Sequence, residues 1–196
     1  MSPVADPIER FMKLLAEAAQ AYPVDYNAMT LSTVGEDGRP SSRVVLLKGA
    51  DASGFVFYTN LGSRKGRDLT RTPWAALCFF WPQLQSQVRV EGRAVRVSDA
   101  EADGYFATRP RGSQLGAWAS KQSDILPSRQ LLEGRVAELD RQFAGQEVPR
   151  PPFWSGFRVT PDRIEFWRNR PDRLHDREVY RRDSESGPWH ADRLFP

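Results

Sequence analysis

Residues 58–65, Tyr-Thr-Asn-Leu-Gly-Ser-Arg-Lys, contain the residue types of a phosphate-binding turn. A strand pattern ends here, Gly62 turns the chain, and Ser63 can cap a helix that starts with Arg64 and Lys65. Backbone N–H groups at a helix N-terminus, together with two cations, would hold an anion. A capped surface helix with exposed basic residues explains the same pattern equally well.

A second group of anion-binding residue types lies at the end of a predicted helix and in the segment after it. It consists of a phenol, two guanidinium groups and a hydroxyl: Tyr105, Arg109, Arg111 and Ser113. Together they could hold a second phosphate. The general preference of helix C-termini for cations accounts for Arg109 as simply.

Arg43 and Lys48 stand at the two ends of an apolar strand pattern, RVVLLK. In an ideal strand their side chains point to opposite faces. They share a ligand only where a bulge or bend intervenes, or where the ligand wraps around the strand end. From the residues alone, two solvated flanking charges are the favoured interpretation.

Near the C-terminus, an extended segment would place Arg173, His175 and Arg177 on one face. A histidine between two arginines suits an anion or proton-transfer site, and a structural histidine is an equally good interpretation. His190 has no periodic cationic partners and is interpreted as structural.

Composition excludes several classes of protein. The chain has 28 Lys and Arg against 25 Asp and Glu, interspersed without a long basic block, which favours small anionic ligands over nucleic acid. Two histidines and one cysteine make a structural zinc site improbable, so no metal is expected. The apolar run 74–81 is too short to span a bilayer, and Asp6, Glu9 and Arg10 stand where a signal peptide would need an apolar run, so a cytoplasmic location is predicted. Cys78, inside the apolar run, is expected to be an inert thiol.

The elements that must position these residues are mostly strands. A helix is predicted at about 7–22, with Asp6 as N-cap and Pro7 in its first turn, and further helices near Ser63, at 98–107 and at 128–143. The segment 109–123 is expected to be a loop. Strands are predicted at 28–33, 43–48, 55–60, 74–81, 87–97, 156–160, 163–167 and 176–181.

This pattern predicts an α+β fold, an antiparallel β-barrel of about six to eight strands with helices packed at its periphery. With 196 residues, we expect one domain over 1–196. No glycine-rich dinucleotide or P-loop motif is present, so a nucleotide cofactor would not bind in a Rossmann-type site.

Taken together and in order, these segments resemble the pyridoxine/pyridoxamine 5′-phosphate oxidase family. Coverage runs from about Ala28 to the C-terminus, and the ordered set is far more specific than any one piece. The matching pieces are RVVLLK (43–48), FYTNLGSRK (57–65), YFATRPRGS (105–113), QLGAWASKQS (114–123), FWSGFRV (153–159), IEFW (164–167), RLHDR (173–177) and DRL (192–194).

The resemblance implies an FMN-binding split barrel and a homodimer with two flavin sites where the subunits meet. The segment 153–196 would contribute to dimerisation and to the active site. Implied cofactor-binding residues are Arg43, Val44, Val45, Leu46, Leu47, Lys48, Tyr58, Thr59, Arg64, Lys65, Gln87, Gln122, Ser123, Trp167 and Arg177. Implied substrate-binding residues are Lys48, Tyr105, Arg109, Ser113, Arg173, Leu174 and His175, with Arg173 and His175 as the catalytic residues over the pyridine ring.

The implied reaction oxidises pyridoxine or pyridoxamine 5′-phosphate to pyridoxal 5′-phosphate, with dioxygen as the electron acceptor and hydrogen peroxide as product. One alternative is a split-barrel flavin oxidase of another ring, as in phenazine-pathway proteins, although Tyr105, Arg109 and Ser113 favour a phosphorylated substrate. A non-catalytic flavin carrier is a second alternative. A nucleic-acid-binding module ranks last because the sequence has no concentrated basic stripe.

Overall fold

The computed structural model describes residues 6–22 and 24–196. Its strands form one antiparallel sheet in the order β2-β1-β5-β6-β7-β4-β3, and β8 and β9 extend it from β7. The strands are β1 (Ala28–Val34), β2 (Pro40–Leu46), β3 (Gly49–Asp51), β4 (Gly54–Asn60), β5 (Trp74–Trp81), β6 (Ser86–Arg96), β7 (Trp154–Arg168), β8 (Asp176–Arg181) and β9 (His190–Arg193).

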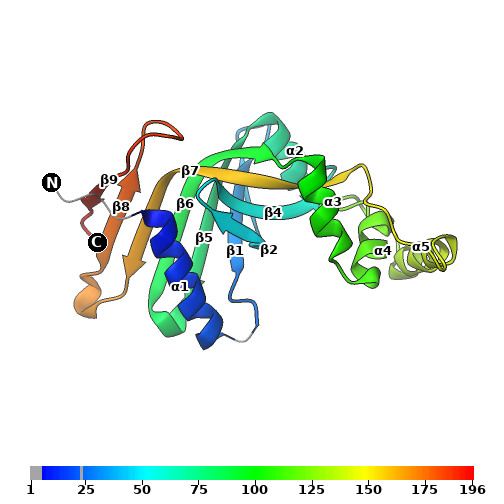
Figure 1. Cartoon of the computed structure of the whole chain (residues 1–196), viewed down its shortest axis with the longest axis horizontal. Helices are drawn as coiled ribbons and strands as arrows, with labels where there is room; N and C mark the ends of the chain where they lie inside the picture. The colour runs from blue at the N-terminus through cyan, green and yellow to red at the C-terminus, as the bar shows by residue number, and fades with distance from the viewer. Residues whose placement is uncertain (1–5, 23) are drawn as a thin grey trace.

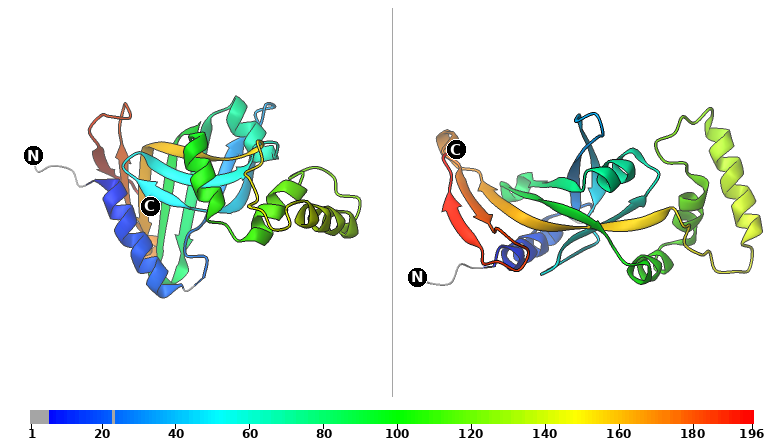
Figure 2. Two further views of the ribbon diagram at one scale, coloured as in Figure 1. Left: turned by 45° about the vertical axis from the view of Figure 1, so that its right-hand side comes forward. Right: turned by 90° about the horizontal axis from the view of Figure 1, so that it is seen from above.

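Five helices accompany this sheet in the described residues: α1 (Pro7–Ala21), α2 (Arg64–Arg71), α3 (Asp99–Ala107), α4 (Arg111–Ala119) and α5 (Arg129–Gln142). Figure 1 shows α3, α4 and α5 gathered at one end of the molecule, while β8 and β9 form the other end. The view from above in Figure 2 shows the same separation, with β7 running between the two ends.

The core of the barrel is closed by α1. Its cap forms as predicted, since the Asp6 carboxylate accepts a 2.8 Å hydrogen bond from the Ile8 N–H. Phe11 is fully buried, and its ring lies 4.9 Å from the rings of both Phe55 and Phe79. Burial of such a ring contributes about 1.5–3 kcal/mol, so α1 is held by its apolar face. The helix ends at Ala21, and Pro23, where a stop was predicted, lies outside the described residues.

The barrel is split because β2 and β3 stand at opposite ends of the strand order and do not pair with each other. After Leu46 the chain leaves β2, and the Lys48 N–H donates a 2.8 Å hydrogen bond to the Val56 carbonyl of β4. Leu47, between them, is buried in the core. The bend that Arg43 and Lys48 need in order to face one ligand is therefore present.

Most predicted elements are confirmed, including the side-chain caps of Ser63 and Ser98, and Ser128 also caps its helix. The loop prediction for 109–123 is wrong, because α4 occupies much of it. Two glycines, Gly112 and Gly116, weaken the helical pattern in the sequence. Burial of Leu115 and Ala119 at its inner face stabilises the helix in the fold.

The strand count is also corrected, since nine strands form in the described residues. The predicted strands 156–160 and 163–167 are one strand, β7. A register shift at Glu91/Gly92 of β6 accommodates Pro161 between them, and the ladder continues on either side. The short strands β3 and β9 were not predicted.

Candidate functional site

The split in the barrel opens a cleft of about 700 Å³ between β2, β4 and the helices α3 and α4. This volume is typical of a small-molecule or cofactor site. The lining residues are Arg43, Val44, Val45, Leu46, Lys48, Tyr58, Thr59, Asn60, Lys65, Tyr105, Arg109, Ser113, Gly116, Ala117, Ser120, Gln122 and Trp154.

The cleft is electropositive. It contains the cations Arg43, Lys48, Lys65 and Arg109, and no carboxylate is among the described residues that line it. Burial lowers the pKa of Lys65, and the nearby charge of Arg43 lowers it further. Burial likewise lowers the pKa of Arg109. An anion in the cleft would relieve this unfavourable crowding of buried positive charge.

Arg43 is held rigidly on the inner face of β2. Its guanidinium donates 2.7 Å hydrogen bonds to the hydroxyls of Thr33 and Ser41. The Thr33 hydroxyl in turn donates a 2.7 Å hydrogen bond to the buried Asp68 carboxylate, which lies 3.9 Å from the Arg43 guanidinium. The solvated flanking charge that the residues alone favoured is therefore ruled out for Arg43.

The N-terminus of α2 meets the segment that follows α4. Lys65 Nζ donates hydrogen bonds to Gln122 Oε1 at 3.0 Å and to Thr59 Oγ1 at 3.2 Å. The Arg64 N–H donates a 3.1 Å hydrogen bond to Ser123 Oγ, and Ser123 adopts a left-handed backbone conformation with φ of 78°. These five residues, all implied by the resemblance, lie together at one side of the cleft.

Aromatic rings support the other side of the cleft. Tyr58 stacks against Tyr105 with a centroid distance of 4.0 Å, and against Trp154 with a distance of 5.3 Å. The Arg109 guanidinium lies 4.8 Å from the centroid of the Trp154 ring, and its buried Nη1 has no hydrogen-bond partner within the described chain. A buried guanidinium nitrogen without a partner is the expected state of an anion-binding group before its ligand arrives.

Arg111 does not belong to the cleft. Its guanidinium binds the Asp140 carboxylate and the carbonyls of Phe143 and Gln146, at the C-terminal end of α5. Arg111 therefore caps the C-terminal end of α5 and does not join Tyr105, Arg109 and Ser113 in an anion site. Ser113, two residues later in α4, lines the cleft as expected.

Sequence reasoning missed several lining residues, among them Asn60, Ser120 and Trp154. Trp154 lies inside the quoted piece FWSGFRV, but a strand was predicted only from Gly156. Its burial, and its place between Tyr58 and Arg109, depend on how α3 packs against β7, which no local pattern reveals.

The remaining predicted residues form a second group around β7 and β8. Gln87 is directly opposite Trp167, and Trp167 is directly opposite Arg177, so the three form one row across β6, β7 and β8. The ring centroids of His175 and Trp167 are 4.6 Å apart. Leu174 is 68% exposed, and Arg173 lies beside it.

The single extended face predicted for Arg173, His175 and Arg177 is wrong. Arg173 ends a short 3₁₀ turn (η2, Pro171–Arg173) in which Asp172 and Arg173 have φ values of 57° and 61°, and β8 begins only at Asp176. Two consecutive left-handed residues reverse the chain here, a conformation that side chains other than glycine rarely adopt.

The two groups lie at opposite ends of the fold. Trp154 supports the cleft at the start of β7, whereas Trp167 is thirteen residues further along the same strand, about 40 Å at the usual rise of an antiparallel strand. Figure 1 shows the same separation between α3–α4 and β8. One chain alone does not bring all the predicted residues together.

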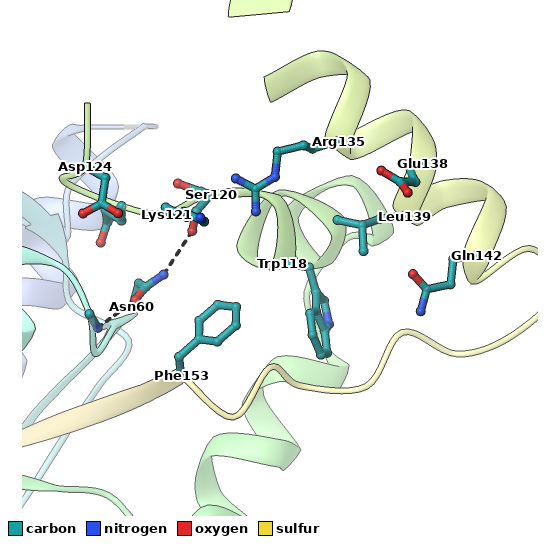
Figure 3. Close-up of a pocket in the computed structure, with 12 residues that line it drawn as sticks. Asn60, Trp118, Ser120, Lys121, Asp124, Arg135, Glu138, Leu139, Gln142 and Phe153 are labelled. Carbon is teal, nitrogen blue, oxygen red and sulfur yellow. Dashed lines mark hydrogen bonds between the residues drawn. The ribbon is translucent and has the colours of Figure 1, made fainter. Parts of the chain in front are cut away.

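A second cavity of about 580 Å³ adjoins the cleft, between the segment after α4 and helix α5. Figure 3 shows Trp118 and Phe153 at its wall and Asn60, which donates a 3.1 Å hydrogen bond to the Ser120 carbonyl. Its charges are mixed: Lys121 and Arg135 face Asp124 and Glu138. The carboxylate-free cleft is therefore the better match for a phosphate.

Two family models match the chain, one for pyridoxamine 5′-phosphate oxidase over residues 15–143 and one for the pyridoxine 5′-phosphate oxidase C-terminal dimerisation region over residues 154–196. The chain belongs to the pyridoxamine 5′-phosphate oxidase family. A relative from Myxococcus xanthus named pyridoxine/pyridoxamine 5′-phosphate oxidase is 63% identical over 97% of this chain and 92% of its own. Another of the same name, from Rubrobacter xylanophilus, is 58% identical over 97% of this chain and 87% of its own.

Solved structures agree with this family membership. PhzG from Burkholderia lata 383, in complex with tetrahydrophenazine-1-carboxylic acid, matches with a TM-score of 0.92 and 37% identity, covering 100% of this chain and 95% of its own. An FMN-binding protein from Nostoc punctiforme shares the fold, with a TM-score of 0.77 at 16% identity. The predicted split-barrel fold is confirmed.

Within the described residues, no helix is both long and apolar enough to cross a membrane.

Proposed function

We propose that this protein is an FMN-dependent oxidase that converts pyridoxine 5′-phosphate and pyridoxamine 5′-phosphate to pyridoxal 5′-phosphate. The observation that carries the proposal is the carboxylate-free cleft, which has one cationic group at α2 and another at α3 and α4. A phosphorylated cofactor and a phosphorylated substrate together require two such groups. The high identity to relatives of that name supports the same conclusion.

The residues present fit FMN. Three cations lie close together at this point. Burial is the main cause that lowers the pKa of Arg43 and the pKa of Lys65. The charge of Arg64 lowers the pKa of Arg43 further, and the charge of Arg43 lowers the pKa of Lys65 further. A dianionic phosphate would neutralise this cluster at the N-terminus of α2. Gln122 supplies an amide for the polar edge of a flavin ring, and the edge strand β2 offers unpaired backbone groups along Val44–Leu46.

The substrate phosphate is proposed to bind at the other side of the cleft. The unpartnered Nη1 of Arg109 would donate to it, with Lys48, Tyr105 and Ser113 as further ligands. The stacked rings of Tyr58 and Trp154 fix the position of Arg109 and keep water away from it. A guanidinium held in this way loses little entropy on binding a phosphate.

A second copy of the chain is proposed to complete each site. The C-terminal region belongs to the dimerisation region of the family, and it carries the second group of predicted residues. In a two-fold dimer, Gln87, Trp167, His175 and Arg177 of one chain would face the cleft of its partner. This arrangement accounts for two groups of site residues that lie far apart within one chain.

Bound FMN would supply the two-electron acceptor for the substrate C4′ carbon, with dioxygen as the proposed final acceptor and hydrogen peroxide as product. The protein's own residues bind and orient. Arg109 and its neighbours hold the substrate phosphate, and Arg173 and His175 are proposed to lie over the pyridine ring. The contact of His175 with the Trp167 ring helps to hold the imidazole in place, where it can assist proton movement at C4′.

Oxidation of a phenazine-type ring is the second candidate, because PhzG matches the whole chain and its structure holds such a compound. The two candidates differ in the anion that Arg109 would hold, a phosphate ester in the first and a ring carboxylate in the second. We also propose one domain over 1–196, supported by the pairing of β7 with β4 and β6 of the preceding region. A cytoplasmic location stays a prediction.

The test is anaerobic reduction of the FMN-loaded protein. Pyridoxine 5′-phosphate and pyridoxamine 5′-phosphate are each expected to bleach the flavin absorbance, which returns when air is admitted. Unphosphorylated pyridoxine is the matched control and is expected to bleach it much more slowly. Bleaching by a reduced phenazine carboxylate but by neither phosphate ester would favour the second candidate, and bleaching by none would leave a flavin carrier.

A further inference from the structure

Glu165 is the most deeply buried carboxylate that the structure places near the predicted site residues. Its side chain is 3% exposed, and it lies on the sheet face that also carries Trp167 and Arg177. Three arginines surround it, with nitrogen-to-oxygen distances of 2.8 Å to Arg177, 3.5 Å to Arg89 and 3.6 Å to Arg163.

This carboxylate is held in its charged form. Burial by itself raises the pKa of Glu165, but the hydrogen bond and charge of Arg177, with the charges of Arg89 and Arg163, bring that pKa below its usual value. A buried anion that costs free energy to desolvate persists only when its partners hold it firmly. Arg177 is the arginine that lies closest to this carboxylate.

Arg177 is held by two hydrogen bonds within the chain. Its Nε donates a 2.8 Å hydrogen bond to Glu165 Oε1, and its Nη1 donates a 3.0 Å hydrogen bond to the Phe195 carbonyl. Among the described residues, Nη2 has no hydrogen-bond partner. The guanidinium therefore has one orientation, with one edge bound to the protein and the other nitrogen left for a ligand.

We propose that Glu165 is a positioning residue for the flavin site, which fixes the Arg177 guanidinium in the orientation that binds FMN. The inference rests on the proposed function, in which Arg177 of one chain reaches the flavin in the cleft of its partner. The competing explanation is a buried ion cluster that only holds β6, β7 and β8 together. Glu91 offers a matched comparison, because it contacts Arg89 at 2.9 Å and Arg163 at 3.7 Å on the same face without touching Arg177.

The experiment measures the dissociation constant of FMN by flavin fluorescence quenching, and the melting temperature of the apo-protein, for a set of variants. Glu165→Gln removes the negative charge. Glu165→Asp keeps that charge beside the arginines, but its shorter side chain withdraws the carboxylate oxygen from Arg177 Nε. Both are expected to weaken FMN binding about tenfold, the loss typical of one charge-assisted hydrogen bond. Arg177→Gln is expected to weaken it at least as much, and Glu91→Gln by less than twofold.

A double-mutant cycle separates positioning from a structural role. If Glu165 acts through Arg177, Glu165→Gln combined with Arg177→Gln weakens FMN binding no more than Arg177→Gln alone. The inference would be overturned if the losses in FMN affinity from Glu165→Gln and Arg177→Gln multiplied in the double variant, or if Glu91→Gln lost as much affinity as Glu165→Gln. Unchanged affinity in both Glu165 variants, or in Arg177→Gln, would overturn it as well. Failure of the wild-type protein to bind FMN would instead count against the proposed function itself.

Discussion

Trp154 and Trp167 lie at the two ends of one strand, β7, and each supports a different part of the predicted site. Trp154 packs against the Arg109 guanidinium, and Trp167 packs against the His175 ring. The strand between them is about 40 Å long at the usual rise per residue. If the substrate phosphate binds Arg109 while His175 lies over its ring, the two residues must come from different chains.

Complementation between two inactive variants tests this arrangement. Lys48→Met/Arg109→Met damages the cleft, and Arg173→Ala/His175→Ala damages the second group. In a randomly mixed 1:1 population of dimers, half are hybrids and each hybrid has one intact site, so about a quarter of wild-type turnover is expected. Each variant mixed with itself is the control. No gain above the parents would mean that each chain builds its site alone.

Substitution of Arg109 is expected to raise the KM for the phosphorylated substrates. Arg109→Met removes a charged donor and keeps the side-chain bulk over Trp154, and loss of such hydrogen bonds costs about 1.5–3 kcal/mol, roughly 10- to 100-fold in KM. Arg111→Met is the control two residues away. It removes the contacts to the carbonyls at the end of α5, so it is expected to lower the melting temperature and leave KM within about twofold. Equal KM values in the two variants would exclude Arg109 as a phosphate ligand.

The sequence predicted best those features that depend on local interactions. The caps at Asp6, Ser63 and Ser98 follow from side chains that bond backbone N–H groups two or three residues away. Helix α4 was not predicted because Leu115, which stabilises it, packs against residues distant in the sequence, such as Val148 and Trp154. The full length of strand β7 was not predicted because its register shift arises from its pairing with β6, which the pattern of one segment does not reveal.

The site illustrates the same limit. For Arg43, the pattern favoured a solvated charge, and only the fold brings Thr33 and Asp68 close enough to fix it. For Arg173, alternation predicted an extended chain, whereas the chain turns through the left-handed residues Asp172 and Arg173, of which only Asp172 is a type that tolerates this conformation. The roles of the individual site residues stay predictions, drawn from the resemblance and consistent with the cleft.

Gly66 is expected to be essential for the geometry of the cofactor turn. A Cβ atom there would lie 2.4 Å from the Leu61 carbonyl oxygen and 2.7 Å from that of Asn60. Gly66→Ala would push α2 away from β4, displacing Lys65, at a cost of about 1–3 kcal/mol in the free energy of unfolding. FMN affinity, measured by fluorescence, is expected to fall at least about tenfold.

Gly134→Ala in α5 is the control, because an added Cβ atom there would meet no atom within 4 Å outside its own helix backbone and chain neighbours. It should instead stabilise the protein by about 0.5–1 kcal/mol, measured by urea unfolding. Normal FMN affinity in Gly66→Ala would contradict the prediction.

Lys65 predicts a pH dependence of FMN binding. Burial, and then the charge of Arg43, lower the pKa of Lys65 below its ordinary value of 10.5. The charged form of Lys65 is therefore disfavoured in the folded apo-protein. The resulting loss of folding free energy is at its full size at pH values below the lowered pKa, and it disappears as pH rises from there to 10.5. A phosphate beside Lys65 favours the charged form and raises the pKa again, so FMN binding takes up a proton within that interval.

FMN affinity is accordingly expected to fall as pH rises through the interval between the lowered pKa of Lys65 and its ordinary value of 10.5. Lys65→Met should bind FMN more weakly at neutral pH and lose this part of the pH dependence. The comparison cancels any titration of FMN itself, because that contribution is common to both proteins. Lys13→Met, on the exposed face of α1, is the control and should follow the wild type. If Lys65→Met kept the full pH dependence, the lysine would not be a ligand of the phosphate.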